Sequence, residues 1–149
     1  MTFTMEALSS SIAGHLAPEL PGVTFYDNPA QQGVKPPALF LRRTNARITK
    51  KLGGRFLRRL GLDLVCVLDF HGLSMDDRYT KIADILDEMM EVFPYIGGEG
   101  SPAFLRTYER RWDIVDDVLH YKFDLKVWVS REEDAVLMQS IESYTEEVS

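Results

Sequence analysis

The chain contains the stretch Leu119-His120-Tyr121-Lys122-Phe123-Asp124-Leu125-Lys126-Val127-Trp128-Val129, in which an apolar side chain stands at every odd-numbered position. Successive residues of a strand point to opposite sides, so this spacing places the odd-numbered side chains on one face. The stretch therefore predicts a β-strand with one buried and one solvated face. A turn at Asp116-Asp117 is expected to join it to an extended segment from Phe104 to Trp112.

A second, longer hairpin is predicted around Gly53-Gly54, a pair that permits a tight turn. A strand that begins at Ala38 leads out to this turn, and Arg55 to Phe70 leads back. We expect the inner half of the hairpin to belong to the core and the outer half to project. On the returning strand, one face carries Phe56, Leu60, Leu62, Leu64, Cys66, Leu68 and Phe70, and the other carries Leu57, Arg59, Asp63 and Asp69.

Helices are predicted on either side of these hairpins. The helical spacing of apolar residues predicts amphipathic helices over residues 4–17 and 77–92, and a capping box at Ser130–Glu133 predicts a third. Val23–Tyr26 predicts a short strand. Residues 1–149 are therefore expected to form a single α+β domain. Its sheet is antiparallel or mixed, built from hairpins and packed against two or three helices, with one long projecting basic hairpin.

Charge is distributed unevenly along the chain. Eight of the 17 Lys and Arg residues lie between Arg42 and Arg59, a segment without Asp or Glu, which leaves nine basic and 23 acidic residues elsewhere. A basic arm of about residues 42–59 on an acidic body is the result. Such a separation suits contact with phosphate, or head-to-tail contact in which one copy's arm meets its neighbour's acidic face.

The basic arm also carries apolar residues, at Ile48, Leu52, Phe56 and Leu57. Exposed apolar groups on a projecting hairpin favour a partner surface over a face that is merely solvated. Binding of nucleic acid is an alternative, although a single-strand binder usually offers several aromatic side chains for stacking. The residues expected to contact a neighbouring subunit or partner are Arg42, Arg43, Arg47, Lys50, Lys51, Arg55, Phe56, Arg58 and Arg59.

Metal-binding patterns are weak in this sequence. The histidines His15, His71 and His120 have no cysteine or acidic partner at metal-ligand spacing, so no zinc site is expected. Cys66, the single cysteine, lies in an apolar run and is interpreted as a small buried hydrophobe. We expect neither a metal nor a cofactor.

A nuclease is the sharpest enzymatic hypothesis. Asp124 and Lys126 lie two residues apart on one strand face, as do the carboxylate that holds the cation and the lysine that orients water in metal-dependent nucleases. An upstream Asp113 or Asp116 would complete such a site. Any alternating strand, however, places charges at this spacing on its solvated face. The sequence therefore favours a protein that is not an enzyme.

Targeting signals are not recognised either. The segment Met1–Glu6 lacks the basic and long apolar regions of a signal peptide. No apolar stretch approaches the roughly 20 residues needed to span a bilayer. We expect a soluble protein that is synthesised in the cytoplasm and has no membrane partner.

Three segments together carry a family pattern. Gln32–Leu41 holds a Gln-Gly pair, a short gap, proline and an extended apolar strand. Lys51–Arg58, followed by Leu62–Leu64, is similar to a Leu-Gly-x-Arg-Tyr-x-Arg hairpin and the strand after it, with phenylalanine in place of tyrosine. Tyr108–Tyr121 is the most specific segment. Together they resemble the tail terminator, or tail completion, proteins of tailed phages and phage-like elements of Gram-positive bacteria.

This resemblance implies a structural virion protein of the tail or neck, made in the host cytoplasm. It implies a hexameric ring at the head-proximal end of the tail tube, which stops tube polymerisation and offers a docking surface to the head connector. DNA passes through the lumen as cargo. The implied partners are further copies of the chain, the tail tube protein, a head-connector or neck protein, and the sheath protein as an additional candidate. Two alternatives stay open: a nucleic-acid-binding module that uses the 42–59 arm, and another neck or head-tail joining protein.

Overall fold

The computed structural model describes residues 3–26, 34–69, 74–97 and 103–129. Its α-helices are α1 (Met5–Leu16) and α2 (Met75–Met89), and its short 3₁₀ helices are η1 (Ala17–Glu19) and η2 (Leu52–Gly54). Its strands are β1 (Thr24–Tyr26), β2 (Ala38–Lys50), β3 (Phe56–Val67), β4 (Val92–Tyr95), β5 (Ala103–Val115) and β6 (Val118–Val129).

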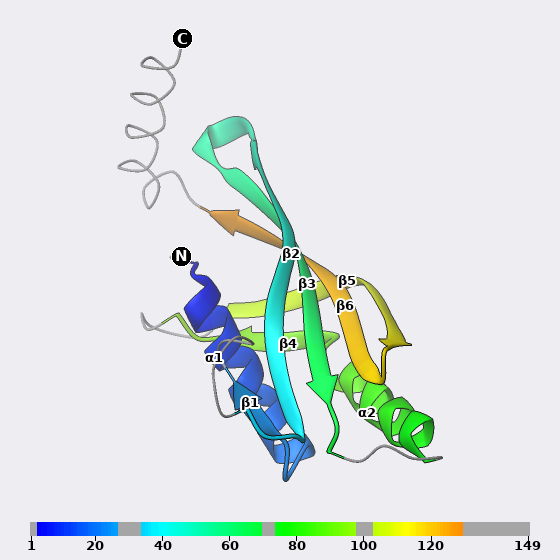
Figure 1. The fold of residues 1–149 in the computed structure, drawn as a ribbon. Coiled ribbons are helices and arrows are strands. Elements are labelled where there is room, and N and C mark those ends of the chain that lie inside the picture. The colour runs from blue at the N-terminus through cyan, green and yellow to red at the C-terminus, as the bar shows by residue number, and fades with distance from the viewer. Residues whose placement is uncertain (1–2, 27–33, 70–73, 98–102, 130–149) are drawn as a thin grey trace.

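The strands form one six-stranded sheet in the order β1-β2-β3-β6-β5-β4. β1 pairs with β2 in parallel, and the other neighbours pair antiparallel. The sheet is therefore mixed, and the predicted α+β class is confirmed. Figure 1 shows that the sheet curls, so that β4 and the first part of β5 cross behind β2 and β3. The helix predicted after Ser130 lies outside the described residues.

The core lies between the two helices and one face of the sheet. The odd-numbered residues of β6 from Leu119 to Val127 are at most 1% exposed, which confirms the predicted buried face. α1, which confirms the helix predicted over residues 4–17, contributes Leu8, Ile12 and Leu16 and packs mainly on β4. Full burial of each large apolar side chain contributes about 1.5–3 kcal/mol, which holds the helices on this face. α2 contributes Met75, Tyr79, Ala83 and Leu86.

The region after α2 differs from the prediction. The helix expected over residues 77–92 ends at Met89, and Val92–Tyr95 forms the strand β4. Pro94 cannot donate a hydrogen bond to a neighbouring strand, but it is tolerated because β4 is the last strand of the sheet. Phe93 and Tyr95 lie in the core at 0% and 1% exposure and anchor β4. The sequence did not predict the edge strand β4, because a proline disfavours a strand.

A bulge in β2 sets the faces of the basic segment. The register of β2 against β3 shifts between Arg43 and Asn45, so Thr44 is the additional residue. Gly61 on β3 leaves space for it, since a Cβ there would lie 2.7 Å from Oγ1 of Thr44. Beyond the bulge, side chains point to the face opposite to the one that strict alternation would give.

The strands β5 and β6 are joined at the predicted turn. Asp116 and Asp117 both have positive φ, 52° and 62°, as the two central residues of a type I′ turn require. β5 also bulges against β6 between Tyr108 and Arg111, where Glu109 has φ 53°. This bulge increases the local bend of β5.

Candidate functional site

The hairpin of β2 and β3 carries the basic segment. The two strands pair antiparallel from Ala38 and Val67 to Lys50 and Phe56. Gly53 and Gly54 have positive φ, 78° and 73°, and the backbone N–H of Lys51 donates to the Arg55 carbonyl oxygen at 2.8 Å. The turn therefore lies at the glycine pair that the sequence indicated.

This hairpin is not a free two-stranded arm. β6 pairs with β3 from Cys66 and Leu119 to Phe56 and Val129, so the returning strand has a neighbour on each side almost to the turn. Figure 1 shows β6 beside β3 along the inner half of the hairpin. The sequence prediction differs here because periodicity identifies strands but does not say which strands pair.

Strand register divides the predicted contact residues between the two faces of the sheet. We call the face turned away from the core helices the polar face. Directly paired residues share a face, so the pairs Arg42–Asp63 and Arg47–Arg59 place these four side chains on the polar face. The turn carries Lys51 and Arg55. The register places Arg43, Lys50, Phe56 and Arg58 on the opposite face.

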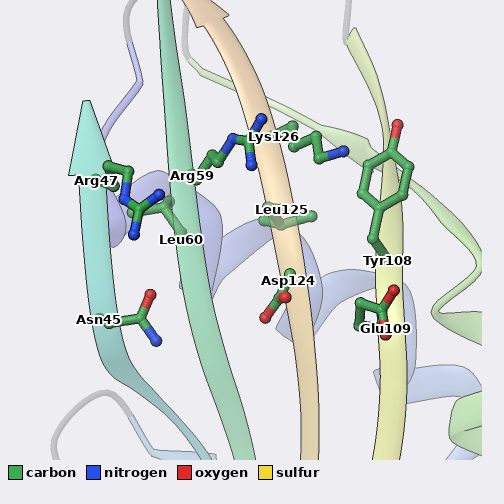
Figure 2. Close-up of a pocket in the computed structure, with 9 residues that line it drawn as sticks. All are labelled: Asn45, Arg47, Arg59, Leu60, Tyr108, Glu109, Asp124, Leu125 and Lys126. Atoms are coloured by element: carbon green, nitrogen blue, oxygen red, sulfur yellow. The ribbon is translucent and has the colours of Figure 1, made fainter. Parts of the chain in front are cut away.

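Three cations form a row on the polar face. Arg47 of β2 lies opposite Arg59 of β3, which lies opposite Lys126 of β6. We call these three residues the cation row. Figure 2 shows their side chains at one end of a cleft, with Asn45, Asp124 and Glu109 toward the other end. The cleft has a volume of about 360 Å³, and its lining is completed by Leu60, Tyr108 and Leu125.

The cation row is electrostatically uncompensated. Within the described part of the chain, none of its three side chains forms an ion pair with a carboxylate. Nζ of Lys126 instead lies 4.5 Å from the centre of the Tyr108 ring. Asp124, which lines the same cleft, is 3.5 Å from the guanidinium of Arg111. The charged groups of the cation row are therefore free to bind an anionic partner.

Asp63 forms a buried polar cluster elsewhere on the polar face. Its side chain is 0% exposed, and its Oδ2 accepts a hydrogen bond from Nη2 of Arg42 at 3.0 Å and lies 2.8 Å from Nδ1 of His120. Oδ1 has no hydrogen-bond partner among the described residues. The face predicted for Asp63 is right, but its burial was not foreseen. Through these contacts, Asp63 of β3 links the strands β2 and β6.

The apolar residues of the hairpin do not share one environment. Ile48 is 61% exposed, as a partner-binding residue would be, whereas Leu57 is 5% exposed. The expectation that Leu57 is an exposed apolar group is therefore wrong, because Thr49 and Trp128 flank it on the neighbouring strands. Arg55 lies over the Trp128 ring at 4.3 Å from its centre, next to the turn.

The two described histidines have polar partners, and the cysteine is buried. Nε2 of His15 lies 2.7 Å from the Met89 carbonyl oxygen, and His120 contacts Asp63. Burial raises the pKa of the Cys66 thiol to about 12, so a thiolate does not form near neutral pH. No group of three potential metal ligands occurs in the described ranges, from which His71 is absent.

Asp124 and Lys126 do share the polar face, but their surroundings do not favour a nuclease. Asp113 lies opposite His120 on β5, and Asp116 lies in the turn. Asp124 is engaged by Arg111 and Lys126 by Tyr108. Glu109 lines the same cleft as Asp124, but no group of three potential metal ligands occurs in the described part of the chain.

Replacing Asp124 and Lys126 together by Ala is expected to lower the free energy of unfolding by less than about 1 kcal/mol, since both contacts are exposed. Urea denaturation of the monomer at high salt measures this cost. The parent chain, incubated with Mg²⁺ or Mn²⁺ and DNA, should show no cleavage. A metal-dependent cleavage activity that disappears in the double variant would contradict the prediction.

The sequence comparisons identify the family. The family described as phage tail terminator protein matches residues 7–136, which covers most of the 149 residues. The chain belongs to the phage tail terminator family. No curated protein matches it with significance.

Family membership assigns the chain a structural role in the phage tail and implies contact with other tail or head components of the virion. The matched range contains the whole hairpin, the cation row and the Asp63 cluster. No helix among the described residues has the length and hydropathy to cross a membrane. Sequence reasoning missed Lys126 as a neighbour of Arg47 and Arg59, because that depends on the pairing of β3 with β6.

Proposed function

We propose that this chain assembles into a ring at the head-proximal end of the tail tube, where it stops tube polymerisation and provides the docking surface for the head connector. The family match over residues 7–136 is the observation that carries this proposal. Six copies is the number that the family resemblance implies. DNA passes through the lumen of the ring as cargo.

The basic hairpin is proposed as a contact between subunits or with a tail partner. It carries the arginines Arg47 and Arg59 on the polar face, where no described carboxylate forms an ion pair with them, and the exposed Ile48 on the opposite face beside Arg58. Closed rings arise from heterologous contacts when the rotation between subunits closes. In such a contact, one surface of a chain binds a different surface of the neighbouring copy. The proposed ring is not an enzyme, and it needs no cofactor.

A phage from which the gene for this chain is deleted is expected to produce filled heads together with tails that are overlong or not joined to heads. Without a terminating ring, addition of tube subunits continues and the connector lacks its docking surface. Electron microscopy of lysates measures tail length and head joining. Expression of the chain from a plasmid is the control and should restore both.

Tails of normal length that are already attached to heads in the deletion strain would contradict the terminator function. A second candidate, direct binding of DNA by the hairpin, is favoured by the uncompensated cation row. A DNA-binding module using several cations would lose affinity steeply as salt rises from about 50 to 200 mM.

A further inference from the structure

The three side chains of the cation row carry like charges and lie next to one another. Like charges directly opposite each other on neighbouring strands destabilise a sheet, and here Arg47, Arg59 and Lys126 stand opposite one another on three strands. No described carboxylate forms an ion pair with them. An anionic group that enters the cleft would relieve this repulsion and form charge-assisted hydrogen bonds with the two guanidinium groups.

The helix α2 presents the complementary surface. Asp77, Asp84 and Glu88 follow each other at intervals of seven and four residues, so they lie on one stripe of the helix. We call these three residues the acidic stripe. All three are exposed, and no ion pair or hydrogen bond of their side chains occurs among the described residues. The buried residues Tyr79, Ala83 and Leu86 occupy the opposite side of the helix.

We infer that the cation row of one copy binds the acidic stripe on α2 of the neighbouring copy. This inference rests on the ring proposed above and names two surfaces that take part in its subunit contact. Figure 1 shows the turn of the basic hairpin and α2 at opposite ends of the sheet. A single chain cannot bring these two surfaces together, so the contact joins two copies. In the proposed ring it is heterologous and runs head to tail.

The charge pattern of the cleft favours a helix over a nucleic acid. Asp124 and Glu109 line the same cleft as the cation row, and they would repel a continuous phosphate backbone. Lys81 is exposed and lies between Asp77 and Asp84 on the helix surface, so the stripe offers a cation as well as carboxylates. The cleft and the surface of α2 thus each carry both cations and carboxylates, so opposite charges can face each other across the contact.

The test reverses charge on each surface separately and then combines the variants. Arg47→Glu with Arg59→Glu makes the cleft acidic, and Asp84→Arg with Glu88→Arg makes the stripe basic. Each double variant is expected to lower the association constant by at least roughly tenfold at about 50 mM salt, where screening is weak. Sedimentation velocity measures the distribution of monomers and rings, and circular dichroism verifies the fold.

An equimolar mixture of the two variants is the decisive measurement. The acidic cleft of one variant can bind the basic stripe of the other, and the unchanged surfaces can bind as in the parent. Rings of alternating variants should therefore form in the mixture although neither variant forms them alone. Glu6→Arg with Glu19→Arg, two exposed residues near α1, is the matched control for charge change and should leave assembly as in the parent.

The outcomes separate this inference from the proposed function. Rings formed equally well by the parent and by both reversal variants would overturn the inference and leave the ring itself supported. Variants that both fail to assemble, alone and mixed, would also overturn it. Loss of binding to a DNA duplex in Arg47→Glu/Arg59→Glu, with rings unchanged, would assign the cleft to nucleic acid instead. A parent chain that stays monomeric at every concentration would overturn the ring and this contact together.

Discussion

Replacing Lys51–Arg55 by Asn-Gly is expected to leave a folded chain that no longer forms rings. The replacement keeps the terminal pair of Lys50 and Phe56 and joins it by a two-residue turn, for which Asn-Gly is the preferred sequence. The fold loses the contact of Arg55 with Trp128, which contributes about 0.5–1 kcal/mol at an exposed site. Ring formation is expected to fail because the replacement removes the part of the hairpin that extends farthest from the core.

Size-exclusion chromatography with light scattering measures the effect on assembly, and thermal denaturation measures the effect on the fold. The matched control, Lys51→Gln with Arg55→Gln, removes the two charges but keeps the length and conformation of the turn. Rings from the control but not from the Asn-Gly variant would show that shape at the turn matters more than charge. Normal rings from the Asn-Gly variant would exclude the turn from the subunit contact.

The strands and helices that depend on local pattern could be predicted from the sequence. The odd-numbered apolar residues of β6 define its buried face, and the spacing of Leu8, Ile12 and Leu16 defines the core side of α1. The turns at Gly53-Gly54 and Asp116-Asp117 follow from residues that tolerate positive φ. Each of these features involves residues close together in the chain, and so a single sequence contains the signal.

The candidate site could be predicted only in part, because it depends on contacts between distant residues. Arg47 and Arg59 belong to one basic segment, but Lys126 joins them through the pairing of β3 with β6. The bulge at Thr44 decides which arginines of β2 share a face, and Gly61 on the opposing strand makes that bulge possible. Neither the strand order nor the bulge leaves a periodic signal in the sequence.

Removal of both partners of Asp63, by Arg42→Met with His120→Phe, is expected to lower the free energy of unfolding by about 3–5 kcal/mol. Asp63 is fully buried, and its Oδ2 contacts both side chains at 3.0 and 2.8 Å. A buried carboxylate without partners still carries the free-energy cost of its desolvation, and no ion pair or hydrogen bond offsets that cost. This desolvation cost sets the expected loss of stability. Urea denaturation of the monomer measures it.

The triple variant Arg42→Met/His120→Phe/Asp63→Leu is the matched control. It removes the buried charge together with its partners, and replacement of a buried ionic group by apolar side chains is often neutral or stabilising. We therefore expect the triple variant to recover most of the stability that the double variant loses. If the double variant were as stable as the parent, the Asp63 cluster would not hold β2, β3 and β6 together. If the triple variant were as unstable as the double, packing at these positions, and not the buried charge, would account for the loss.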